Sequence, residues 1–96
     1  MRMLMVVYSG SSPQKISSLF DTYPAGGYTE FRNAHGAGST GKRGGSRAWP
    51  GESTLFVTVV PESQSEELVE TLRAEAPRLP VGERLHVAVL PTIAFF

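Results

Sequence analysis

Residues 54–60 read TLFVTVV, a run rich in β-branched side chains and apolar on both of the faces that a strand presents. Pro61 closes the run, because a proline has no N–H to give to a strand ladder. Residues 3–8, with the sequence MLMVVY, form a second continuously apolar run that ends in the polar segment SGSSP. Both runs predict strands with both faces buried.

The segments that follow these two strands carry helical patterns. Ser12 before Pro13 predicts an N-cap with proline at the first helical position. The apolar face of this helix comprises Ile16, Leu19, Phe20 and Tyr23. Ser63 or Ser65 is the expected cap of the second helix, since Ser63 and Glu66 have capping-box spacing. The apolar stripe of that helix comprises Leu68, Val69, Leu72 and Ala76.

Two further segments are expected to be strands, residues 28–35 (YTEFRNAH) and residues 83–90 (ERLHVAVL). The resulting order is strand, helix, strand, strand, helix, strand. This order predicts an α+β fold of the ferredoxin-like βαββαβ type, with one antiparallel sheet, two helices on one face and a long loop between strands 2 and 3. Residues 1–96 are expected to form a single domain.

The predicted sheet has more apolar surface than its helices can cover. Several strands are apolar on both sides, whereas two short helices cover only one face of a sheet. The opposite face would then expose an apolar patch larger than a soluble monomer usually carries. We therefore expect a closed homo-oligomer.

Composition restricts the class of protein. The chain has no cysteine, so neither a disulfide framework nor a thiolate zinc site can support its small core. The N-terminal apolar run lacks a signal-peptide cleavage pattern, and no run approaches the roughly 18–20 apolar residues that span a bilayer. These features favour a cytoplasmic protein with no direct membrane insertion.

Charge is balanced overall but uneven along the chain. Nine Lys and Arg residues offset nine Asp and Glu residues. Residues 36–51 are basic and rich in glycine, whereas residues 62–75 contain five glutamates and one arginine. Three cations in the loop do not make a nucleic-acid surface, so no nucleic-acid partner is expected. The glycine-rich composition of the loop predicts a mobile segment that forms neither a helix nor a strand ladder.

The segment GAGSTGK, residues 36–42, matches a GxGxxG pattern and most of a P-loop. Both motifs need a helix directly after the glycines, and Gly44, Gly45 and Pro50 make such a helix improbable. Arg43 also stands where a P-loop needs Ser or Thr. Two interpretations stay open: an anion-binding nest of backbone amides beside the cationic side chains, or a solvated flexible loop.

Residues 27–61 resemble the region from the second strand through the T-loop to the third strand of PII-like signalling proteins. The features that carry the resemblance are the GxG of Gly36 and Gly38, the long basic loop, and Pro50-Gly51 before an apolar strand. The resemblance implies a homotrimer without catalytic activity. It also implies adenine nucleotides, such as ATP, ADP or AMP, in clefts between subunits. The T-loop, residues 36–53, would be flexible and would regulate a partner protein.

The resemblance assigns roles to individual residues. It places Gly36 and Gly38, with Ser39 and Thr40 beside them, at the phosphate end of the cleft between subunits, and the anion-nest interpretation adds Gly41 and Lys42 as ligand-binding residues. The expected partner-binding residues are Arg43, Arg47 and Trp49, and for Trp49 the alternative of holding the loop to its own scaffold stays open. The chain departs from the family pattern in three places. The segment LPVGER replaces a glycine-rich B-loop, the final IAFF has no arginine, and the T-loop tyrosine that some members modify is absent. These departures indicate a divergent relative.

Two alternatives from other classes stay open. The first is a CutA-like trimeric protein that binds divalent metal through His35 or His86, although a lone histidine is more often structural and no metal ligand is assigned. His86 is expected to be partly buried and hydrogen-bonded in its strand. The second is a ligand-free structural interaction module. Phe95 and Phe96 are expected to bury against the sheet edge or a neighbouring subunit.

Overall fold

The computed structural model of the protein describes residues 1–22, 27–38, 41–43 and 53–96. Their secondary structure follows the predicted order, with one addition between the second and third long strands. The elements are β1 (Arg2–Ser9), α1 (Pro13–Phe20), β2 (Thr29–Ala34), β3 (Gly36–Gly38), β4 (Gly41–Arg43), β5 (Ser53–Val60), α2 (Glu62–Glu75), a 3-10 turn (Ala76–Arg78) and β6 (Arg84–Pro91).

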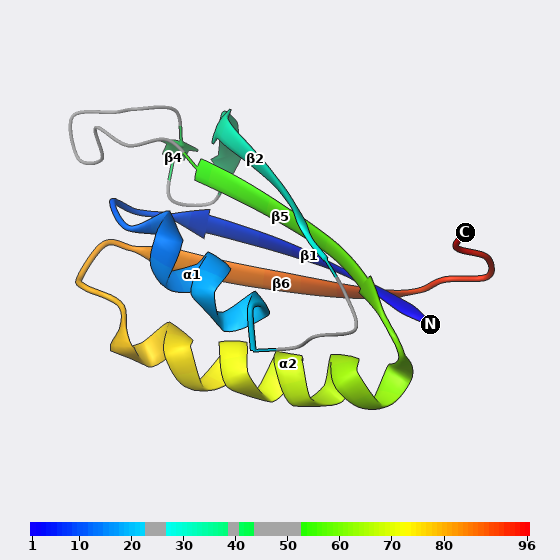
Figure 1. Ribbon diagram of the computed structural model, residues 1–96. Helices are drawn as coiled ribbons and strands as arrows, with labels where there is room; N and C mark the ends of the chain where they lie inside the picture. Colours follow the sequence, from blue (N-terminus) through cyan, green and yellow to red (C-terminus); the bar gives the residue numbers. More distant parts are fainter. Residues whose placement is uncertain (23–26, 39–40, 44–52) are drawn as a thin grey trace.

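The four long strands form one antiparallel sheet in the order β2-β5-β1-β6. Near the middle of the sheet, Val6 of β1 pairs with Phe56 of β5 on one side and with Val87 of β6 on the other. Both helices cover the same face of this sheet (Figure 1). The prediction of a ferredoxin-like α+β fold is therefore confirmed.

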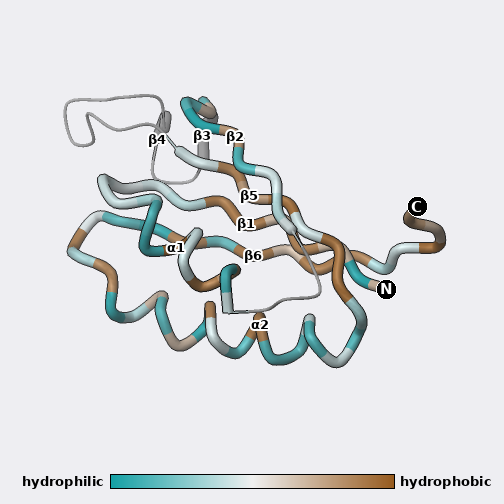
Figure 2. The backbone as a smooth tube through the Cα atoms, in the orientation of Figure 1, coloured by the Kyte–Doolittle hydropathy of each residue, from teal (hydrophilic) through white to brown (hydrophobic). Residues whose placement is uncertain are grey.

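The core lies between the sheet and the helices. Its fully or almost fully buried members are Leu4, Val6, Tyr8, Phe56 and Val60 from the sheet, with Ile16, Phe20, Leu68 and Leu72 from the helices. The Phe20 ring lies 5.1 Å from the Tyr28 ring and 5.5 Å from the Phe56 ring, measured between centroids. Figure 2 shows the hydrophobic stretches along β1 and β5 and the many hydrophilic residues along α2.

The starts of the two helices differ from the predicted caps. α1 begins at Pro13 as expected, but the Ser12 side chain caps no amide. Instead, the Ser12 backbone N–H donates to the Tyr8 hydroxyl over 3.0 Å. α2 begins at Glu62, so the predicted capping box at Ser63 is wrong. Ser63 already lies within the first turn of α2.

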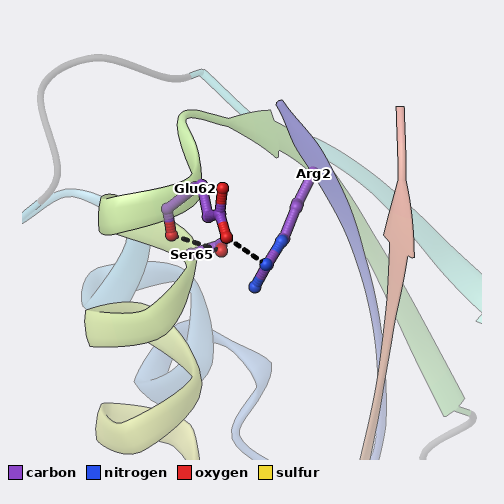
Figure 3. A network of polar contacts seen from close by, with 3 residues as sticks. All are labelled: Arg2, Glu62 and Ser65. Carbon is purple, nitrogen blue, oxygen red and sulfur yellow. Dashed lines mark hydrogen bonds and ion pairs between the residues drawn. The ribbon is translucent and has the colours of Figure 1, made fainter. Parts of the chain in front are cut away.

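The early start of α2 has a physical cause. Glu62 places a carboxylate in the first turn, where the helix dipole favours negative charge, and this carboxylate also pairs with Arg2 of β1. The Ser65 hydroxyl donates back to the Glu62 carbonyl oxygen over 2.7 Å (Figure 3). The ion pair joins the start of α2 to the start of β1, and the Ser65 hydrogen bond lies within the first turn of the helix.

The open face of the sheet, opposite the helices, carries apolar side chains of several strands. Met5 is 36% exposed, Leu90 is 40% exposed and Phe31 is 52% exposed. His86 is also exposed, and no hydrogen bond to it occurs among the described residues, so the prediction of a partly buried, hydrogen-bonded histidine is wrong. Its strand β6 lies at the sheet edge, where no neighbouring strand or helix of the described chain covers its outward side chains.

The C-terminal phenylalanines do not bury against their own sheet. Phe95 borders a hollow above Met3 and Val57 but stays 63% exposed, and Phe96 is fully exposed. The sheet-edge half of that prediction is therefore wrong, because the chain turns away from the sheet after Pro91. Their burial by a neighbouring subunit stays a prediction.

β3 and β4 form a short antiparallel hairpin at the end of β2. Gly36 pairs with Arg43, and Gly38 pairs with Gly41. The expectation that the loop forms no ladder is wrong for this part of it. A ladder needs only backbone groups, and the connection between the two strands is short, so the entropy cost of closing it is small. Lys42 and Arg43 lie in a strand, where a P-loop would need a helix.

Candidate functional site

One end of the sheet brings together polar residues of three strands. Ser9 of β1 pairs in register with Ser53 of β5 and with Arg84 of β6, and Ser53 also pairs with Ala34 of β2. Since residues in one register row share a face, these side chains belong to the open face. Ala34 is followed closely by Gly36, where the β3–β4 hairpin begins. We call the three polar residues Ser9, Ser53 and Arg84 the loop-root row.

The two serines of the loop-root row are in direct contact. Their Oγ atoms lie 2.7 Å apart, and Ser9 and Ser53 are 7% and 4% exposed. A contact between two hydroxyls uses one of their two protons. No acceptor among the described residues takes the second proton, so it can donate to an acceptor outside them, such as an anionic oxygen.

Arg84 supplies positive charge to this row. Its side chain is exposed, and no carboxylate among the described residues forms an ion pair with it. A guanidinium offers several N–H donors in a fixed plane, which suits carboxylate and phosphate oxygens. Arg84 lies in one register row with the two serines, and together they would offer donors suited to a small anion.

A second polar cluster lies on the helix side of the same sheet end. The Tyr8 hydroxyl donates to Glu83 Oε1 over 2.7 Å, and the Ser11 N–H and hydroxyl each approach Glu83 Oε2 at 3.3 Å. Gly10 passes so close that an added Cβ would lie 2.4 Å from the Tyr8 hydroxyl oxygen. Only glycine fits at this position without a shift of its neighbours.

Burial raises the pKa of Tyr8 to about 12, the hydrogen bond from the Ser12 amide opposes this rise, and the nearby Glu83 carboxylate adds to it. In the unfolded chain the Tyr8 hydroxyl ionises near pH 10. Between pH 10 and 12 the unfolded chain therefore binds fewer protons than the folded protein. The free energy of unfolding is therefore expected to be unaffected by Tyr8 below pH 10 and to fall by about 2–3 kcal/mol as the pH rises from 10 to 12. Urea unfolding at several pH values measures this, and Tyr8→Phe should flatten the curve.

The structure describes only part of the site predicted from sequence. Gly36, Gly38, Gly41, Lys42 and Arg43 form the backbone of the hairpin beside the loop-root row. The other predicted residues, Ser39, Thr40, Arg47 and Trp49, lie outside the described residues. Sequence reasoning missed the loop-root row. The register between strands decides which residues meet in it, and neither their spacing nor their periodicity encodes that register.

The metal alternative finds no support in the described part of the chain. His35 is exposed in the link between β2 and β3, and His86 is exposed on β6. No group of three or more His, Cys, Asp or Glu side chains that could hold a metal ion occurs among the described residues.

Comparison with known proteins gives matches among solved structures. No protein-family model matches the chain, and no curated protein matches it. A solved structure of CPII, a nitrogen regulatory PII-like protein from Thiomonas intermedia K12, superposes with a TM-score of 0.69 at 21% identity, over 93% of this chain and 84% of CPII. The fold is that of PII-like proteins.

Two further solved structures are similar to this chain. A protein of Thermus thermophilus, described as a PII-like signalling protein, gives a TM-score of 0.63 at 24% identity, over 92% of this chain and 83% of that chain. A functionally unknown protein from Pediococcus pentosaceus gives 0.61 at 15% identity, over 99% and 94% of the two chains. The CPII structure contains ADP, AMP and bicarbonate. At these identities the comparison establishes the fold alone.

None of the helices in the described residues has the length and apolar character needed to cross a membrane.

Proposed function

We propose that this protein is a PII-like regulatory protein that senses a small anionic ligand, an adenine nucleotide, at clefts between subunits. It acts as a sensor rather than an enzyme, and it regulates a partner protein through the T-loop, residues 36–53. The observation that carries the proposal is the loop-root row at the base of the β3–β4 hairpin, in a fold shared with a protein bound to ADP and AMP.

The loop-root row accounts for an anion better than for a neutral ligand. Arg84 is a cation without an ion-pair partner among the described residues, and the two serine hydroxyls beside it can donate a proton. Lys42 and Arg43 follow in the hairpin that starts next to the row. A phosphate at this place would meet charge-assisted hydrogen bonds, which are the stronger class.

The open face supports the homotrimer in the same proposal. Met5, Phe31 and Leu90 expose apolar surface on one side of the sheet, and water is a poor environment for so much of it. A second and third copy would cover this face, and the loop-root row lies at the end of the same face. A ligand there would therefore lie near a subunit boundary.

Calorimetric titration with ATP, ADP, AMP and cyclic AMP tests the nucleotide part of the proposal. We expect saturable binding of at least one of the four. Arg84→Ala should weaken that binding by about 10–100-fold, because a hydrogen bond to a charged group contributes about 1.5–3 kcal/mol. Arg78→Ala is the matched control, since this exposed arginine lies in the 3-10 turn after α2. Failure of all four nucleotides to bind would contradict the nucleotide proposal.

A further inference from the structure

Glu83 and Arg84 are neighbours in sequence but serve opposite sides of the sheet. Arg84 pairs with Ser9 in the loop-root row, whereas the Glu83 carboxylate contacts Tyr8, a core residue of the helix side. Successive side chains in extended backbone point to opposite faces. The acidic group therefore lies away from the face that carries the cation, although the two residues are adjacent.

The Glu83 carboxylate is held by donors of β1 and of the β1–α1 turn. Oε1 accepts from the Tyr8 hydroxyl at 2.7 Å, and Oε2 accepts from the Ser11 N–H and hydroxyl at 3.3 Å. The close approach of Gly10 lets this turn reach the carboxylate. Tyr8 in turn accepts from the Ser12 N–H at 3.0 Å, which makes a connected network of one acid and its neighbours.

The backbone of Glu83 is fixed as well. Its N–H donates to the Pro80 carbonyl oxygen over 3.0 Å and closes the turn that precedes β6, in which Gly82 has a φ of 90°. This positive φ suits glycine, and the turn leads directly into Arg84. Glu83 is thus the point at which the connection from α2 is fastened to the end of β1, one residue before the cation of the loop-root row.

We propose that Glu83 is a positioning residue for the anion site: by fastening the start of β6 to the β1–α1 turn, it holds Arg84 beside Ser9 in the geometry that binds the anion. This inference rests on the proposed function. Glu83 touches no ligand itself, and hydrogen-bond donors on the helix side of the sheet stabilise its negative charge. A site whose cation is held in place loses less conformational entropy when it binds its ligand.

A double-mutant cycle on AMP binding tests the inference, with Glu83→Gln, Arg84→Ala and the double variant compared with the unchanged chain by calorimetry. A glutamine keeps the size of the side chain, but its NH₂ group cannot accept the hydrogen bonds that one carboxylate oxygen accepts. We expect Glu83→Gln to weaken AMP binding by about 3–10-fold when Arg84 is present, the range of one or two lost hydrogen bonds. The same change should have no effect on the affinity when Arg84 is alanine.

Controls separate positioning from general destabilisation. Glu67→Gln makes the same chemical change on the exposed surface of α2 and should leave AMP affinity unchanged. Urea unfolding of each variant verifies that binding is measured on folded protein. Tyr8→Phe, which removes one donor to Glu83, should weaken AMP binding in the same direction if the network acts through Glu83.

The outcomes distinguish the inference from the function on which it rests. If the unchanged chain binds neither AMP nor any of the other three nucleotides, or if Arg84→Ala binds its nucleotide as tightly as the unchanged chain does, the anion site itself is wrong. If Arg84→Ala weakens binding while Glu83→Gln does not, the site stands and the positioning role is wrong. An equal loss from Glu83→Gln in both backgrounds would also overturn the positioning role, because the effect would not pass through Arg84.

Discussion

Replacing Phe56 with alanine is expected to lower the free energy of unfolding by about 3–5 kcal/mol, the usual cost of truncating a buried phenylalanine. Phe56 is fully buried in the middle of β5, and its ring packs against the rings of Phe20 and Tyr28. The truncation removes these ring contacts and leaves a cavity between the sheet and α1. A domain of this size typically has about 5–15 kcal/mol of stability in total, so a large fraction of it would be lost.

Urea unfolding followed by circular dichroism measures this loss. Val81→Ala truncates an apolar side chain at a fully exposed position and should change the stability by less than about 0.5 kcal/mol. A loss below about 1 kcal/mol for Phe56→Ala would contradict the placement of this ring at the centre of the core.

The long strands could be predicted because their composition leaves few alternatives. Residues 54–60 and 3–8 are too apolar and too short for anything but buried strands, and the structure places them side by side as β5 and β1. Their boundaries shifted by only one residue, since Ser53 and Ser9 still join the ladder. The α2 start was missed because the contacts of Glu62 with Arg2 are tertiary, and local capping patterns contain no information about them.

The candidate site was harder to predict than the fold. Glycine spacing drew attention to residues 36–42, and the hairpin there does lie next to the loop-root row. Arg84 was overlooked because it resembles any other charged residue at a strand end. Its importance comes from its register partner Ser9, which lies far away in sequence. Asn33, with a φ of 59°, gives a related example, because it lies where the register of β2 shifts and sequence alternation alone missed that irregularity.

In the proposed trimer the subunits contact one another through the open face of the sheet. Met5 lies near the middle of that face. Its register partners are Val57 of β5 and Ala88 of β6, so apolar or small side chains flank it on both sides. A carboxylate placed here would be exposed to water in a single chain but buried in an assembly. Burying an unpaired charge costs several kcal/mol, which a contact between subunits would have to overcome.

Met5→Glu is therefore expected to convert the assembled protein into single chains at micromolar concentration, as measured by light scattering coupled to size-exclusion chromatography. The unchanged protein should have the mass of three chains. Ala74→Glu introduces the same charge at an exposed position of α2 and should leave that mass unchanged. Because the loop-root row lies on the same face, Met5→Glu should also weaken nucleotide binding if the cleft between subunits completes the site. A Met5→Glu variant that keeps the mass of three chains would show that another surface joins the subunits, and a single-chain mass for the unchanged protein would rule out the trimer itself.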